Sequence, residues 1–154
     1  MGKLFMAYLS LFIFVLLVLA AASTGSLFKP GEWYASLNKP SWTPPNWMFP
    51  VVWSVLYIFI AFAGWFVWEE HGAGFLLFLW VLQLILNMAW SFIFFGRKKM
   101  FLGLIDILIL WLVILVFIIF SYQLVPVASY LFIPYLLWVS VAAFLNFDIF
   151  RKNA

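Results

Sequence analysis

Aromatic and amide side chains recur at helical spacing in three segments of the chain, and together they could hold a flat apolar molecule. Phe49, Trp53 and Tyr57 are four residues apart, so they lie on one face of a helix. Aromatic rings offer flat apolar area with polar edges, which suits a planar polycyclic ligand. The stripe therefore predicts one wall of a pocket. Two further stripes would supply the other walls: Gln83, Asn87, Trp90 and Phe94, and Trp138, Ala142, Leu145 and Asn146.

Such stripes have a second interpretation, because aromatic residues in membrane helices often serve packing or form belts at the two interfaces. We assign four other tryptophans to such packing or belt roles: Trp65, Trp68, Trp80 and Trp111. The pocket is favoured over a belt because of residues 33–45, WYASLNKPSWTPP, which we call the cap. Its three prolines limit its freedom before anything binds. The cap is therefore predicted to be a pre-shaped lid over the pocket.

Few other side chains could do chemistry. The chain has no Cys and one His, His71, which we expect on a surface loop, so a metal site is not expected. Asp106 is the one acid well inside a predicted span, where a carboxyl group is a functional candidate. It could equally pair with Lys98 or Lys99, or with a buried indole N–H. Asp148 is interpreted as a solvated charge at the end of the last helix.

The elements that must position these residues are membrane helices. Hydrophobic residues make up 69% of the chain, charged residues 8%, and mean hydropathy is +1.19. We predict an all-α polytopic membrane protein: a bundle of five transmembrane helices with a structured loop between the first two. Residues 1–154 form a single domain. The helices are placed at about 4–22, 47–68, 75–95, 101–122 and 126–150, with Asn46 as the N-cap of the second and a kink at Pro134.

Basic residues predict the orientation. Seven of the eight lie in the cap region, the third loop or the C-terminus: Lys29, Lys39, Arg97, Lys98, Lys99, Arg151 and Lys152. We expect these on the cytoplasmic side and the N-terminus outside. The first apolar run, ending in Ala20–Ser23, could pass for a signal peptide, but cleavage would split the basic residues between compartments, so a retained span is expected. The scattered basic residues predict no nucleic-acid site.

Several motifs resemble those of the TspO/MBR family, the tryptophan-rich sensory and translocator proteins also called peripheral-type benzodiazepine receptors. The similarity covers essentially the whole chain. It rests on the cap, Pro50–Trp53 with Leu56–Tyr57, Gln83 to Asn87, Trp90 with Phe94–Gly96, and Pro134–Trp138 with Leu145–Asn146.

The resemblance implies a membrane receptor or sensor, usually dimeric, that binds porphyrins such as protoporphyrin IX or haem as ligands and requires no cofactor. It also implies binding of isoquinoline and benzodiazepine-type ligands under the cap. The implied ligand-binding positions are Tyr34, Pro44, Phe49, Trp53, Tyr57, Asn87, Trp90, Phe94, Trp138, Ala142 and Leu145.

Two alternatives stay open. One is light- and oxygen-dependent degradation of protoporphyrin IX, for which the resemblance implies Trp53 and Trp138 as photochemical residues in place of a conventional catalytic set. The other is passive transport of porphyrins or apolar metabolites. The family's sterol pattern is broken, because Phe147 stands where a tyrosine is expected. The short chain favours a bacterial protein of the plasma membrane.

Overall fold

Five long helices and one short helix make up the computed structural model of the chain, which describes residues 2–154; Met1 of the predicted domain lies outside the described residues. No strand occurs in residues 2–154. The helices are α1 (Gly2–Leu27), α2 (Glu32–Ser36), α3 (Met48–His71), α4 (Phe75–Ser91), a π-helical turn η1 (Phe92–Gly96), α5 (Met100–Leu124) and α6 (Pro126–Asn153). The all-α prediction is confirmed.

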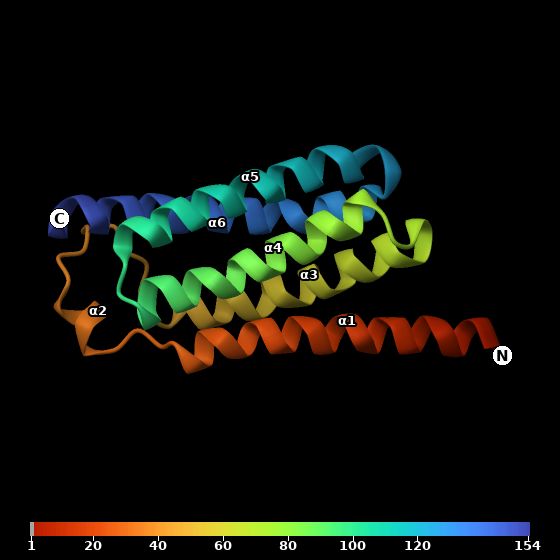
Figure 1. Cartoon of the computed structure of the whole chain (residues 1–154), viewed down its shortest axis with the longest axis horizontal. Helices are drawn as coiled ribbons and strands as arrows, with labels where there is room; N and C mark the ends of the chain where they lie inside the picture. The colour runs from red at the N-terminus through yellow and green to blue at the C-terminus, as the bar shows by residue number, and fades with distance from the viewer. Residues whose placement is uncertain (1) are drawn as a thin grey trace.

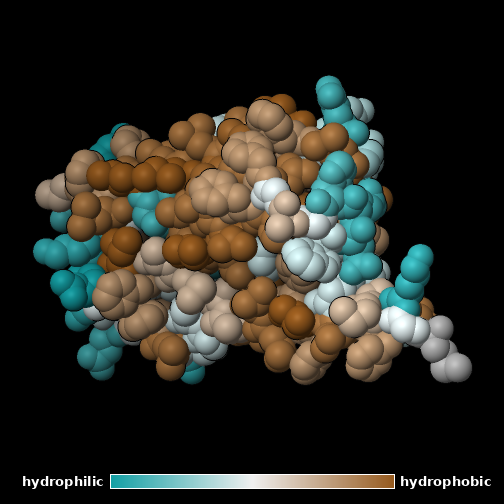
Figure 2. All heavy atoms as spheres, turned by 45° about the vertical axis from the view of Figure 1, so that its right-hand side comes forward, coloured by the Kyte–Doolittle hydropathy of each residue, from teal (hydrophilic) through white to brown (hydrophobic). Residues whose placement is uncertain are grey.

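The five long helices are each long and apolar enough to cross a membrane. On the face that Figure 2 shows, hydrophobic residues form a broad band, and hydrophilic residues gather at the two ends of the molecule. Side chains in that band face outward because lipid, unlike water, solvates them. The chain is therefore an integral membrane protein.

The helices run up and down through the bundle, so that alternate connections meet at the same end (Figure 1). Helix α1 packs on α3 and α4, whereas α6 packs on α5 and α3. The segment containing α2 lies at the end where the chain terminates, beside the turn between η1 and α5. That end carries the predicted site.

Two helix boundaries differ from the predictions: the end of α1 and the start of α3. Helix α1 continues to Leu27, five residues past the expected end, and the Phe28 N–H still donates to the Thr24 carbonyl at 2.8 Å. The prediction of Asn46 as N-cap of α3 is wrong: Trp47 holds that position without a side-chain bond. The Met48 N–H instead donates to the Pro45 carbonyl at 2.9 Å, so the cap itself closes the first turn.

Two local features fix the ends of α3 and α4. Gly72 follows α3 with φ of 64°, a left-handed conformation that ends helices and favours glycine, and its N–H donates to the Trp68 carbonyl. At η1 the Arg97 N–H reaches back five residues to the Phe92 carbonyl at 2.8 Å. This wide turn buries Phe94 beneath the cap. Helix α6 is continuous from Pro126 to Asn153, with Pro134 inside it.

One of the four tryptophans assigned to packing or a belt, Trp80, is a packing residue of the core. Trp80 has 0% exposure and its indole N–H donates to the Ile60 carbonyl at 2.8 Å. Its ring meets Phe14 edge to face at 4.9 Å and lies directly against Gly64. The absence of a side chain at Gly64 therefore lets α1, α3 and α4 pack around one indole, a core role that periodicity alone does not distinguish from a belt.

Candidate functional site

The cap is folded onto itself and fastened to the bundle. Its α2 segment turns back so that the Lys39 ammonium donates to the carbonyls of Tyr34, Ala35 and Leu37, at 2.7, 3.2 and 3.1 Å. The same ammonium lies 4.8 Å from the centre of the Tyr34 ring. Further along, the Thr43 N–H and hydroxyl both bond to the Pro40 carbonyl. The cap is thus pre-shaped, as its prolines predicted.

The C-terminal end of α6 is hydrogen-bonded to the cap. Asn153 exchanges two hydrogen bonds with the backbone of Asn38: it accepts from the N–H at 2.9 Å and donates to the carbonyl at 3.0 Å. The Trp42 indole donates to the Asp148 carboxylate at 3.1 Å, and Arg151 pairs with that carboxylate at 3.3 Å. The interpretation of Asp148 as a merely solvated charge is therefore wrong, because the folded cap brings an indole to it.

Beneath the cap lies a cluster of aromatic rings from three helices. Tyr34 meets Phe95 at 5.5 Å and Phe94 at 6.3 Å, and Trp90 stacks on Phe94 at 5.1 Å with ring planes 11° apart. Burial raises the pKa of the Tyr34 hydroxyl, which lies outside the spans. Leu145 of α6 is buried in the same cluster.

A second part of the site lies one level deeper, where α3 faces α6. Trp53 stacks on Tyr57 at 5.4 Å and meets Tyr135 at 6.1 Å, and Phe49 meets Trp138 edge to face at 5.6 Å. The stripes of α3 and α6 therefore converge, and Ala142 is packed beside them. Pro44 is half-buried in the cap above.

The buried amides Asn87 and Gln83 of α4 are connected to α3 and α6 by hydrogen bonds to tyrosine hydroxyls. Asn87 accepts from the Tyr57 hydroxyl at 3.0 Å and donates to the Tyr135 hydroxyl at 3.0 Å. Tyr135 in turn donates to Gln83 at 3.0 Å, and its ring has 0% exposure. The amide pair therefore points into protein, as predicted. Tyr135 was not among the predicted site residues, although two buried amides on one helix face signal that a polar partner must exist nearby.

Asn146 performs a similar function nearer the cap. It accepts from the Trp90 indole at 3.1 Å and donates to the Met100 carbonyl at 3.0 Å. Through these bonds α6 fixes the orientation of Trp90 and of the first turn of α5. The predicted stripe of Trp138, Ala142, Leu145 and Asn146 thus reaches both levels of the site.

Asp106 is buried, with 7% exposure, and its Oδ2 has no hydrogen-bond partner in residues 2–154. The described residues give it no ion pair with Lys98 or Lys99 and no bond to an indole, so the structural pairings considered from sequence are wrong. Both lysines are exposed, and Lys98 has φ of 56° in the turn before α5. That turn directs the lysines to the bundle end, away from the carboxyl group.

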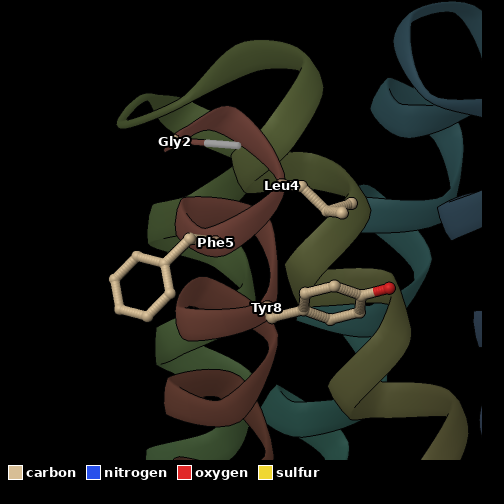
Figure 3. Close-up of a pocket in the computed structure, with 4 residues that line it drawn as sticks. All are labelled: Gly2, Leu4, Phe5 and Tyr8. Carbon is tan, nitrogen blue, oxygen red and sulfur yellow. The ribbon is translucent and has the colours of Figure 1, made fainter.

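Other predicted residues lie away from this site. His71 is exposed at the opposite end, as expected, near the Leu124 carbonyl. A shallow hollow at that end involves Leu4, Phe5 and Tyr8 of α1 (Figure 3). Its labelled residues all come from one helix, and Phe5 points away from the neighbouring ribbons, so the hollow has no opposing wall.

Comparison with known proteins agrees with this architecture. Residues 14–151 match the model of the TspO/MBR family. The chain is 41% identical over 134 residues to a tryptophan-rich sensory protein of Cereibacter sphaeroides, covering 87% of this chain and 85% of the relative. It is 40% identical over 152 residues to tryptophan-rich protein TspO of Chlorobaculum tepidum, covering 94% and 96%. It is also 40% identical over 138 residues to the human translocator protein, covering 84% and 81%. The chain, with its capped bundle of five long apolar helices, belongs to the TspO/MBR family.

Proposed function

We propose that this protein is a membrane sensor that binds planar aromatic molecules of the porphyrin class, protoporphyrin IX or haem, beneath the cap. The convergence of aromatic side chains from α3, α4 with η1, and α6 under a tethered cap carries the proposal. Flat rings supply stacking area, while a few amide and hydroxyl groups supply orientation. Isoquinoline and benzodiazepine-type molecules have the same flat apolar character and are proposed to compete for this site.

The names of the relatives support the same reading, since they include a sensory protein and a translocator. We propose a homodimer in the plasma membrane of a bacterium, with the cap and C-terminus cytoplasmic. The contact residues of the proposed site are Tyr34, Pro44, Phe49, Trp53, Tyr57, Asn87, Trp90, Phe94, Trp138, Ala142 and Leu145. Binding would use these side chains alone and would need no cofactor or sterol.

Titration of the detergent-purified protein with protoporphyrin IX in the dark tests the proposal. Tryptophan quenching should saturate, and Trp53→Phe or Trp138→Phe should weaken binding by about tenfold, because each removes an indole from the site. Trp68→Phe is the matched control, since Trp68 is exposed on the outside of α3. Equal affinity in all three variants would place the ligand elsewhere.

The same samples under illumination address the photochemical alternative. Stable porphyrin absorbance would support a sensor that binds without consuming its ligand. Loss of absorbance that requires both Trp53 and Trp138 would instead assign turnover to these residues. Net porphyrin flux into sealed vesicles would favour a carrier.

A further inference from the structure

A lateral groove lies between α3 and α6, beside the predicted site. Its volume is about 390 Å³, within the size range of small-molecule sites. Its rim residues Val55 and Val141 are 46% and 36% exposed. The lining is Val51, Val52, Val55, Leu56 and Phe59 of α3 with Pro134, Leu137, Trp138 and Val141 of α6.

The chemistry of the groove points to an occupant that comes from the bilayer. Every lining side chain is hydrocarbon except the indole N–H of Trp138, and the groove lies within two spans, so its open side faces acyl chains. A water-soluble molecule would lose its hydration there without compensation. An apolar molecule already dissolved in the membrane would not.

Trp138 adds a polar requirement. Its indole Nε1 is buried and has no hydrogen-bond acceptor in residues 2–154. Four other indoles of the helices have one: Trp65, Trp80, Trp90 and Trp111 donate to Ala7, Ile60, Asn146 and Ser140. A buried indole N–H ordinarily finds a partner, and in hydrocarbon no water replaces it. The occupant is therefore expected to carry an acceptor such as a carbonyl or carboxyl oxygen.

The groove adjoins the aromatic site, whereas the aqueous end is fastened. Trp138 forms part of the groove and meets Phe49 at 5.6 Å, and Phe49 packs against the cluster under the cap. The cap is tied down by the bonds of Asn153 and Asp148 to Asn38 and Trp42. Entry from the membrane side breaks none of these bonds.

We propose that the α3–α6 groove is the entrance of the site: a planar apolar molecule bearing a hydrogen-bond acceptor enters from the bilayer, displaces the side chains that cover the Trp138 N–H and then bonds it. This inference rests on the proposed function. It assigns a binding surface outside the capped cluster, and of the eleven proposed contact residues only Trp138 lines it.

Stopped-flow mixing of proteoliposomes with vesicles loaded with protoporphyrin IX tests the entrance, with tryptophan quenching as the readout. Val55→Phe and Val141→Phe each fill the groove from a different helix, and their exposed positions allow the bundle to fold. Leu112→Phe on α5 is the matched control, because Leu112 is 55% exposed but lies outside the groove. Helical circular dichroism and the thermal midpoint check each variant.

Blocking an entrance slows both directions without changing the bound state. We expect association and dissociation to slow by about tenfold in both groove variants, with Kd within about twofold of the wild type. Unchanged rates, or faster dissociation alone, would overturn the entrance while leaving binding intact. Acceleration by Asn153→Ala with no effect of the groove variants would assign entry to the cap and also overturn it. No saturable binding by the wild type would overturn the proposed function and this inference together.

Discussion

At the scale of single residues, most polar side chains inside the bundle have a hydrogen-bond partner, and a few buried polar atoms do not. Asn87 donates to the Tyr135 hydroxyl and Tyr135 donates to Gln83 Oε1, whereas Gln83 Nε2 is buried without a partner in residues 2–154. Asp106 Oδ2 is likewise buried without a partner in residues 2–154. An unpaired buried polar group costs about 1–3 kcal/mol, so Asp106 Oδ2 supplies no stabilising bond that a substitution would remove.

Asp106→Asn is therefore expected to change the free energy of unfolding by less than about 1 kcal/mol, because it removes no ion pair. Chemical denaturation of the detergent-solubilised protein measures this. Lys98→Ala and Lys99→Ala should likewise leave the free energy of unfolding nearly unchanged. A loss of about 3–5 kcal/mol on Asp106→Asn would reveal a buried ion pair after all.

Substitution of Gly64, in contrast to that of Asp106, is expected to lower stability. A Cβ added there would collide with the Trp80 indole and come within 2.8 Å of Phe14. Gly64→Ala should destabilise the protein by about 1–3 kcal/mol through overpacking. Gly25→Ala is the control, since nothing lies within 4 Å of its Cβ position in α1. A thermal midpoint for Gly64→Ala equal to that of the control would mean that α1 and α4 can move apart freely.

At the scale of elements, the cap acts as a unit because its own hydrogen bonds shape it and α6 holds it. Lys39 gathers three carbonyls at the end of α2, and Asn153 fixes Asn38 with two bonds. The basic residue of the cap thus serves the internal geometry of the cap. The cap should therefore open separately from the five long helices.

Asn153→Ala tests that separation. Losing two hydrogen bonds, each worth about 0.5–1.5 kcal/mol, should raise amide hydrogen exchange in residues 33–45 by about tenfold. The thermal midpoint of the five long helices should remain near that of the wild type. Lys152→Ala is the matched control, because Lys152 is exposed on the adjacent position. Unaltered exchange in Asn153→Ala would show that other contacts hold the cap.

At the scale of the whole molecule, the five long helices bring the cap, the α4–α5 turn and the C-terminus to one end. Most basic residues of the chain lie in those segments. The opposite end holds the α3–α4 turn and the last turn of α3, which carries Glu69 and Glu70. An excess of Lys and Arg on cytoplasmic loops predicts that the capped end faces the cytoplasm.

The absence of cysteine from the sequence makes this orientation simple to measure. Ala73→Cys in the α3–α4 turn and Arg97→Cys in the α4–α5 turn are both at exposed positions. A membrane-impermeant maleimide applied to intact cells should label the first and spare the second. Permeabilised cells should label both. The reverse pattern would contradict the predicted orientation.

The sequence alone determined the class, the helices and the faces that pack inward. Apolar runs of roughly 20 residues can only be membrane helices, because each satisfies its backbone internally. Periodicity then placed Gln83 and Asn87 inward, since amides avoid lipid. These inferences need only local spacing and the solvent.

Only the tertiary structure decided which side chains meet. The sequence pattern does not distinguish Trp80 from the other tryptophans. In the folded bundle it is enclosed by Gly64 and Phe14, which belong to two other helices. Asp148 became a partner of Trp42, 106 positions away in the chain, only when the cap folded onto α6. The unpartnered indole of Trp138 follows from the same cause, because what surrounds an N–H depends on helix packing that no local pattern encodes.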